Sequence, residues 1–137
     1  MKEKEKINSP ARLNYTRDPK ILLMYPPLQF PPEDSAKPEG SLGLLYLAGT
    51  LRQHGYKVDI LDACVGNDNY TLEETFFRQI KLPNGLIRIG MSLDQIAREI
   101  VPYDVVGITS LFTQQTSRAI EVVKFIKKVD PSKLVIL

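Results

Sequence analysis

The sequence predicts an α/β domain built on a flavodoxin-like (Rossmann-like), doubly wound parallel sheet. Apolar strand-like runs alternate with helical patterns along most of the chain, as in parallel sheets whose strands are joined by helices. The runs are continuously apolar, which is typical of strands covered on both faces. Right-handed crossovers then give the strand order 2-1-3-4, and such a sheet binds ligands where its first and third strands end side by side.

Length and charge narrow the class of protein. The 137 residues suit one domain, which we place at 20–137, and 43% hydrophobic content is ordinary for a globular chain. The net charge is +2, and residues 1–20 alone carry +3, with six basic and three acidic side chains. This balance argues against nucleic acid as a partner, and we expect residues 1–19 to be a polar, disordered leader.

The content of cysteine and histidine excludes a disulfide-bonded domain and a Cys/His metal-binding domain. One cysteine and one histidine allow neither an internal disulfide nor a Cys/His metal site within the chain. The sequence has no secretory signal and no apolar run that approaches a membrane span. We therefore expect a cytoplasmic protein.

The first half of the domain follows a strand, helix, strand pattern. A strand is expected at Ile21–Tyr25, followed by two prolines and a loop over residues 28–40. Ser41 caps a helix that runs to about His54, and Gly55 supplies its left-handed stop. The second strand is expected at Lys57–Asp62.

An insertion at 63–92 separates the second strand from the third. Thr71–Glu74 has the capping-box pattern of a short amphipathic helix containing Leu72, Phe76 and Ile80. Asn84–Gly85 predicts a hairpin turn. A second capping box, Ser92–Gln95, opens a helix that ends near Pro102.

The last elements are a strand, a helix and another strand. They are expected at Asp104–Ser110, Thr116–Lys128 and Lys133–Leu137. The sequence stops on the fourth strand, so we expect a truncated domain from a longer polypeptide, without the fifth strand of its fold. The unpaired edge at Lys133–Leu137 would allow an artificial dimer.

The predicted crevice is rich in hydroxyls and lacks charge. It places Tyr25–Pro27 opposite Thr109–Thr113, with the helix start at Ser41 facing the same space. This suits a large ligand with neutral amides and one phosphate. The glycine-rich dinucleotide turn and the phosphate-binding P-loop are absent from the sequence. A flavodoxin-like domain for a flavin or another nucleotide, and a non-catalytic protein-interaction domain, remain alternatives.

Five ordered segments resemble one known family. It is the amino-terminal cobalamin (vitamin B12)-binding domain of cobalamin-dependent radical SAM enzymes, such as methyltransferases and relatives of the anaerobic magnesium-protoporphyrin ester cyclase. The resemblance covers roughly residues 20–137. The segments are Leu-Met-Tyr-Pro-Pro at 23–27, Pro-Glu-Gly-Ser-Leu-Gly-Leu-Leu-Tyr-Leu-Ala at 38–48, and the stretches 51–63, 82–92 and 103–113.

The resemblance implies a cofactor and a missing partner domain. Cobalamin would be bound here, whereas S-adenosylmethionine and a 4Fe-4S cluster would belong to a C-terminal radical SAM barrel. The Cys-x-x-x-Cys-x-x-Cys motif of that barrel is absent from this sequence, so we expect no catalysis by this chain alone.

The resemblance also suggests the residues around the cofactor. The wider fold often has Asp-x-His-x-x-Gly after its first strand, with the histidine below cobalt; this chain has prolines there, and His54 is expected at the far end of its helix. Cobalamin would therefore bind base-off without a histidine ligand. Thr109–Leu111 would contact its nucleotide tail, although strand-end hydroxyls also commonly bond the local backbone. The candidate residues are Tyr25, Pro26, Pro27, Ser41, Leu42, Gly43, Thr109, Ser110, Leu111 and Thr113.

Overall fold

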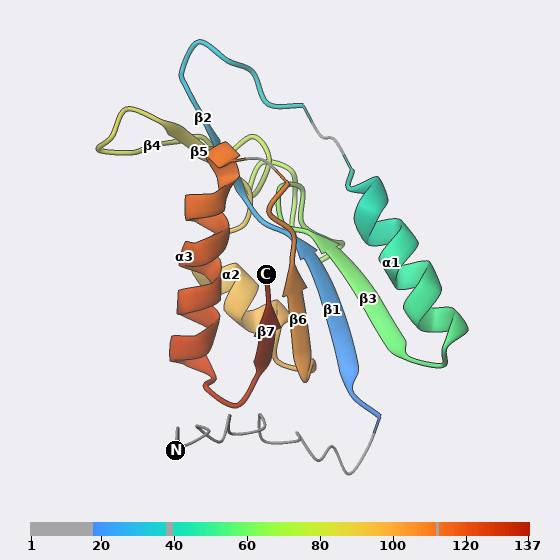
Figure 1. Cartoon of the computed structure of the whole chain (residues 1–137). Coiled ribbons are helices and arrows are strands. Elements are labelled where there is room, and N and C mark those ends of the chain that lie inside the picture. Colours follow the sequence, from blue (N-terminus) through green and yellow to red (C-terminus); the bar gives the residue numbers. More distant parts are fainter. Residues whose placement is uncertain (1–17, 38–39, 112) are drawn as a thin grey trace, which may run out of the picture.

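The main sheet of the protein has four parallel strands. The structure is a computed structural model that describes residues 18–37, 40–111 and 113–137, so most of the expected leader lies outside the described residues. The sheet order is β3-β1-β6-β7 (Figure 1). This is the predicted order 2-1-3-4, and the fold class is confirmed. The strands are β1 (Lys20–Tyr25), β3 (Lys57–Asp62), β6 (Val105–Ile108) and β7 (Leu134–Ile136).

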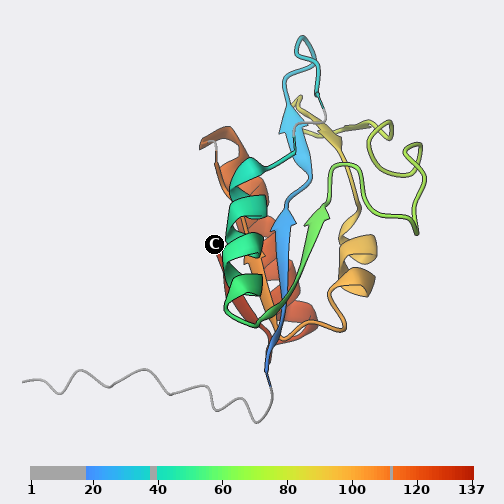
Figure 2. The same ribbon diagram turned by 90° about the vertical axis from the view of Figure 1, so that its right-hand side faces the viewer.

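Helices lie on both faces of this sheet. Helix α1 (Leu42–Gln53) packs on one face, and α2 (Leu93–Glu99) and α3 (Thr113–Val129) pack on the other (Figures 1 and 2). Alternate residues of each strand point to opposite faces. The core under α1 contains Ile21, Leu23, Leu44, Ala48, Val58 and Val105. The core under α2 and α3 includes Leu22, Met24, Val106, Ile96, Ile100, Val122 and Ile126.

The helix starts follow the local capping chemistry. The hydroxyl of Ser41 accepts a hydrogen bond from the Leu44 amide at 3.3 Å, and Gly55 has φ +86° just beyond the end of α1. Ser92 and Gln95 exchange both capping-box bonds at the start of α2. These predictions are confirmed. Helix α3 begins at Thr113, three residues earlier than expected, because its first turn is polar and adds nothing to the apolar pattern.

A second, smaller antiparallel sheet lies beyond the carboxyl ends of the main strands (Figure 1). The hairpin predicted at Asn84–Gly85 is confirmed and joins β4 (Ile80–Lys81) to β5 (Ile87–Ile89). The third strand, β2 (Leu28–Phe30), occupies part of the segment that was expected to be a loop. Three residues are too few to show a strand period, and β2 is set by its pairing with β5.

The helix expected from Thr71 to Ile80 is wrong. Thr71 and Glu74 do form the capping contacts, at 2.8 to 3.3 Å. Residues 72–77 nevertheless form successive turns, and Ile80 belongs to β4. The hydroxyl of buried Thr75 donates to the Val65 carbonyl at 2.9 Å. This bond ties the segment to the chain after β3, so tertiary contacts override the local helix signal.

None of the helices in the described part of the chain combines the length and apolar character needed to cross a bilayer.

Candidate functional site

The carboxyl ends of β1 and β6 meet at the edge of the sheet where α1 and α3 begin (Figure 1). Met24 and Ile108 are register partners, and the amide of Thr109 donates to the Met24 carbonyl at 3.1 Å. The last residues of the two strands are therefore held side by side. The strand ends are neighbours, as the predicted strand order requires, and the hydroxyl-bearing residues Thr109 and Ser110 directly follow β6.

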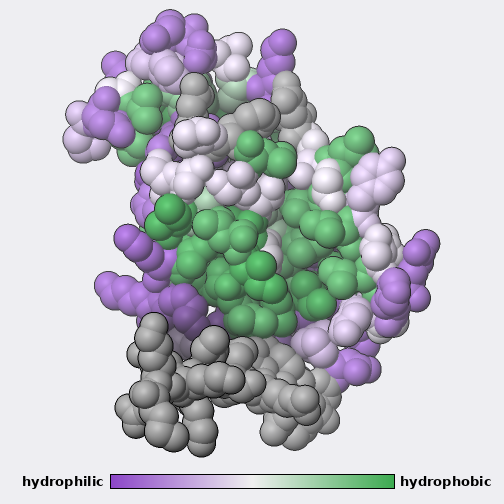
Figure 3. Space-filling view, viewed as in Figure 1, coloured by the Kyte–Doolittle hydropathy of each residue, from purple (hydrophilic) through white to green (hydrophobic). Residues whose placement is uncertain are grey.

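A large apolar cavity opens from this edge along the α1 face of the sheet. Its volume is about 730 Å³, and its described lining side chains carry no charge. Figure 3 shows the corresponding hydrophobic area in the middle of the molecule. Four predicted site residues line the cavity, namely Ser41, Gly43, Thr109 and Leu111. The other lining residues include Leu23, Leu44, Tyr46, Leu47, Leu51, Val105, Gly107, Ile136 and Leu137.

Two glycines keep this cavity open. A Cβ atom at Gly107 would lie 2.9 Å from Leu23 Cδ2, so a side chain here would crowd the floor. A Cβ atom at Gly43 would have only the Ser41 hydroxyl near it, at 4.0 Å, so the wall beside the start of α1 borders open space. The cavity thus depends on small residues in one strand and one helix.

Tyr25 and the prolines occupy different surroundings from these four residues. Tyr25 lines a separate cavity of about 550 Å³ beneath residues 33–37, together with Gln115. Pro26 and Pro27 are fully buried and line neither cavity. A Cβ atom at Gly90 would lie 3.1 Å from Pro27 Cβ. The prolines therefore pack against the segment around Gly90. They also set the direction in which the polypeptide leaves β1.

The remaining predicted residues lie at the rim. The hydroxyls of Ser110 and Thr116 are 3.1 Å apart, which links the end of β6 to the first turns of α3. Thr113 is the first residue of α3 and is exposed. Leu42 is 64% exposed and lies on the outer side of α1. The structure therefore gathers four of the ten residues in one cavity and spreads the others around it.

Cys64 is a packing residue. Its thiol is buried and donates to the Pro26 carbonyl at 3.4 Å. Burial, with the nearby Asp62 carboxylate second, raises the pKa of the thiol far above its usual range. Burial also raises the pKa of Asp62, against the opposing effect of the Cys64 amide, which donates to its Oδ1 at 2.9 Å. A thiol held protonated is not a nucleophile.

His54, the single histidine of the sequence, lies at the end of α1 away from the crevice. It is the C-cap residue of the helix, is exposed, and has its Nδ1 2.8 Å from the Thr50 carbonyl. The described residues contain no group of three or more His, Cys, Asp or Glu side chains that could hold a metal ion. The cavity offers hydroxyl and backbone groups and no imidazole.

Sequence reasoning missed several lining residues. Gly107 is the clearest, because a glycine inside the apolar run Val-Val-Gly-Ile signals a close approach by backbone or ligand. The helical spacing of Leu44 and Leu47 indicates only the inward face of a helix. Leu47 is 55% exposed, however, and lines the cavity.

The fold and the cavity define an α/β cofactor-binding domain of the doubly wound class, with an apolar site on one face of its sheet. A sequence model of the B12 binding domain matches residues 35–137, which is well over half of the chain. The chain therefore belongs to the B12-binding domain family, and its cofactor is cobalamin. The predicted resemblance to a cobalamin-binding domain is confirmed.

A curated protein is also similar to this chain. Cytidylyl-2-hydroxyethylphosphonate methyltransferase from Streptomyces wedmorensis is 28% identical over 131 residues. The match covers 93% of this chain and 22% of that protein, so the chain spans about a fifth of the length of this relative. No solved structure matches.

The chemical groups that line the cavity match those of cobalamin. The cofactor has a flat apolar nucleotide base, a phosphate and many neutral amides. The apolar floor at Gly107 and Val105 suits a ring, and hydroxyls at Ser41 and Thr109 can bond amides or phosphate oxygens. The lining side chains carry no charge, so they place no unpaired ion against the neutral base and amides of the cofactor.

Proposed function

We propose that the chain is the cobalamin-binding module of a radical SAM enzyme. It holds the corrin base-off at the crevice, without a histidine ligand, beside a barrel domain that performs the chemistry. The observation that carries this proposal is the apolar cavity of about 730 Å³ with Ser41 and Thr109 at its crevice end. The distance of His54 from this edge, at the other end of α1, supports the absence of a protein ligand below cobalt.

We assign the nucleotide tail of cobalamin to the cavity. Ser41, Gly43, Thr109 and Leu111 would border it, because these four candidates share its lining. Ser110, Thr113, Tyr25 and Leu42 would surround the corrin at the rim. The buried Pro26 and Pro27 would act through the direction they give the chain. Bound cobalamin supplies a cobalt centre that carries a methyl group or changes redox state.

The outer side of α1 supports a partner domain. Leu42, Leu45 and Tyr46 are 57 to 71% exposed along this helix, and a helix that is apolar all round is normally buried. We propose that it docks against the radical SAM barrel, which would hold S-adenosylmethionine and the 4Fe-4S cluster. The methyltransferase relative favours methyl transfer as the reaction of the whole enzyme. The buried free thiol of Cys64 supports a cytoplasmic location.

Titration with hydroxocobalamin and methylcobalamin tests this proposal. We expect saturable binding by calorimetry and a visible spectrum showing loss of the lower nitrogen ligand. The variant His54→Ala should leave the spectrum unchanged, since this histidine lies at the wrong end of α1. No binding by this chain, and none by a form extended through the next strand and helix, would contradict the proposal. Retention of a flavin, or binding of a protein alone, would instead favour one of the alternative functions.

A further inference from the structure

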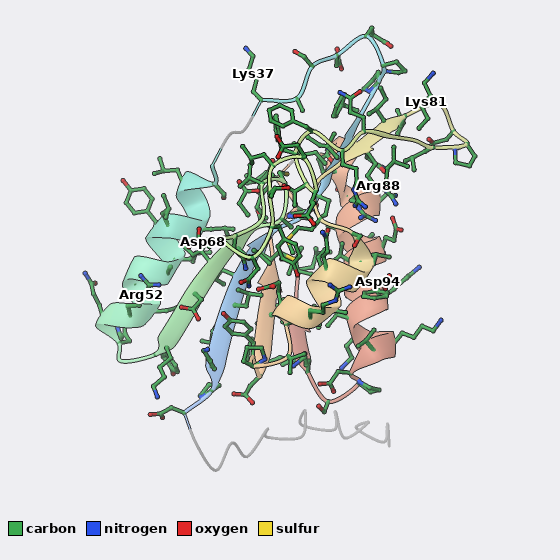
Figure 4. The ribbon with its side chains drawn as sticks, turned by 180° about the vertical axis from the view of Figure 1, so that it is seen from behind. Lys37, Arg52, Asp68, Lys81, Arg88 and Asp94 are labelled. Atoms are coloured by element: carbon green, nitrogen blue, oxygen red, sulfur yellow. The ribbon has the colours of Figure 1, made fainter. Side chains whose placement is uncertain are left out.

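A second pocket lies on the opposite side of the molecule, between β5, α2 and α3. Its volume is about 330 Å³, and three arginines, Arg78, Arg88 and Arg118, line it. Figure 4 shows this side of the molecule, where Arg88 and Asp94 both lie beside α3. Arg88 is the nearer of the two to the small sheet, and Asp94 lies at the start of α2. The pocket shares no lining residue with the cavity assigned to cobalamin.

Arg118 is the deepest of the three arginines. It is 1% exposed, and its Nε and Nη1 have no hydrogen-bond partner among the described residues. Nη1 lies 2.8 Å from Glu121 Oε2, which makes an ion pair without hydrogen-bond geometry. Burial lowers the pKa of this guanidinium, and Glu121 offsets the effect only in part. A buried cation with unmet donors is costly unless an anion reaches it.

Arg88 and Arg78 also have N–H donors without a hydrogen-bond partner among the described residues. Arg88 Nη2 lies 2.9 Å from Glu121 Oε2, the oxygen that also faces Arg118. Arg78 Nη2 donates to the Gly90 carbonyl at 3.3 Å. The Nε atoms of both side chains are buried without a partner among the described residues. One carboxylate oxygen therefore serves two arginines, and the third has only a carbonyl.

The charges around the pocket leave a surplus of one positive charge. Three guanidinium groups face two carboxylates, Glu121 and Asp94. Glu121 is 42% exposed, so water weakens its pull on the arginines. Guanidinium groups bind phosphate and carboxylate oxygens through parallel hydrogen bonds, which one shared oxygen of Glu121 does not supply.

We propose that this pocket binds the phosphate group of a small organic phosphate. The donors of Arg78, Arg88 and Arg118 would take the phosphate oxygens. The apolar lining residues Ile80, Leu93 and Phe125 would contact the organic part of the ligand. The volume of about 330 Å³ is at the small end of ligand sites, which favours a compact ester over a dinucleotide. The site does not depend on cobalamin.

Calorimetric titration of the whole chain with inorganic phosphate and with phenyl phosphate tests the site. Sodium chloride at matched ionic strength serves as the blank. We expect saturable binding of both anions, with phenyl phosphate several-fold tighter because of the apolar lining. Arg88→Gln should weaken both by about tenfold, the usual effect of losing a charge-assisted hydrogen bond. Arg98→Gln, an exposed arginine of α2 outside the pocket, is the matched control and should change nothing.

Glu121→Gln separates a binding site from a structural ion pair. If the pocket binds phosphate, this variant binds more tightly, because it frees two arginines. Arg118 variants carry a risk of misfolding, so Arg88→Gln and Glu121→Gln are the decisive pair, each checked by circular dichroism. The proposal is overturned by the absence of saturable binding, by equal affinity in wild type and Arg88→Gln, or by binding of polyglutamate alone, which would make the pocket a docking site for protein carboxylates.

Discussion

The two faces of the main sheet differ in how completely they are covered. The face under α2 and α3 is closed, and Ile96, Val122 and Ile126 there have no exposed surface. The opposite face has α1 over part of it, and Leu47 and Ile136 remain more than half exposed around the open cavity. Both faces are built from the same apolar strands.

This difference suggests that the closed face stabilises the fold and that the open face serves for binding. The closed face resembles an ordinary protein interior, where close packing stabilises the fold. The open face exposes an apolar surface that a soluble domain normally covers with another element, a partner or a ligand. Under the proposed assignment, cobalamin covers part of this open face and replaces the missing side-chain contacts.

The largest effect is expected from truncating one isoleucine on each face. Ile126→Ala removes a fully buried side chain of α3 and should lower the free energy of unfolding by about 2–5 kcal/mol. Ile136→Ala, the matched change on the open face where the side chain is 53% exposed, should cost less than about 1 kcal/mol. Urea denaturation measures both, and equal losses would show that the faces do not differ.

A smaller effect is expected from filling the cavity floor. Gly107→Leu places a side chain where a Cβ already lies 2.9 Å from Leu23 Cδ2, so it should weaken cobalamin binding by about tenfold or more. Gly49→Ala is the control, because a Cβ there meets nothing within 4 Å and the residue lies outside this cavity. Calorimetry should show unchanged binding in the control. Full affinity for cobalamin in Gly107→Leu would show that the cofactor does not bind in this cavity.

Removing one hydroxyl at the crevice should have a more modest effect. Thr109→Val keeps the shape of the side chain and loses its hydrogen bond, which should weaken cobalamin binding by about fivefold. Thr50→Val is the control, since that hydroxyl bonds the Tyr46 carbonyl on exposed α1. If both variants titrate like wild type, the Thr109 hydroxyl serves the local backbone instead.

The smallest effect concerns pH and two carboxylates. Burial raises the pKa of Asp62 in the folded state, so its contribution to stability is full below its unfolded pKa of about 3.9 and is lost as pH rises. The free energy of unfolding of Asp62→Asn should therefore exceed that of the wild type at neutral pH. The difference between the two should become smaller as the pH falls.

Asp130 provides a control of the opposite sign. Hydrogen bonds from Ser132 lower the pKa of this carboxyl. Its contribution is present above the unfolded pKa and is lost as pH falls, so Asp130→Asn should be destabilised at neutral pH. Urea unfolding across the acid range measures both variants. Parallel pH profiles for the two would contradict these assignments.

Elements with their own hydrogen-bonding chemistry could be predicted from the sequence. Ser41, Gly55 and the box at Ser92–Gln95 fix helix ends through contacts within a few residues, and these ends lie where expected. The strand order also follows from the alternation of strands with helices and from the right-handedness of such crossovers. Thr71–Glu74 shows the limit of this reasoning, because the cap formed and the helix did not.

The parts that escaped prediction depend on distant residues. Strand β2 exists through its pairing with β5, about sixty positions away. The cavity arises where Gly107 faces Leu23 across neighbouring strands, although the glycine within an apolar run was a usable signal. Arg78, Arg88 and Arg118 share no motif, and they come together only because the small sheet lies beside α3, where Arg88 pairs with Glu121.

Hydrogen–deuterium exchange with and without hydroxocobalamin compares both faces of the main sheet in one experiment, and so shows which face binds the cofactor. We expect slower exchange in α1 and in residues 105–111 when the cofactor is bound, with exchange in α2 unchanged. Protection confined to α2 and α3, or no protection at saturating cofactor, would contradict the assignment of cobalamin to the open face.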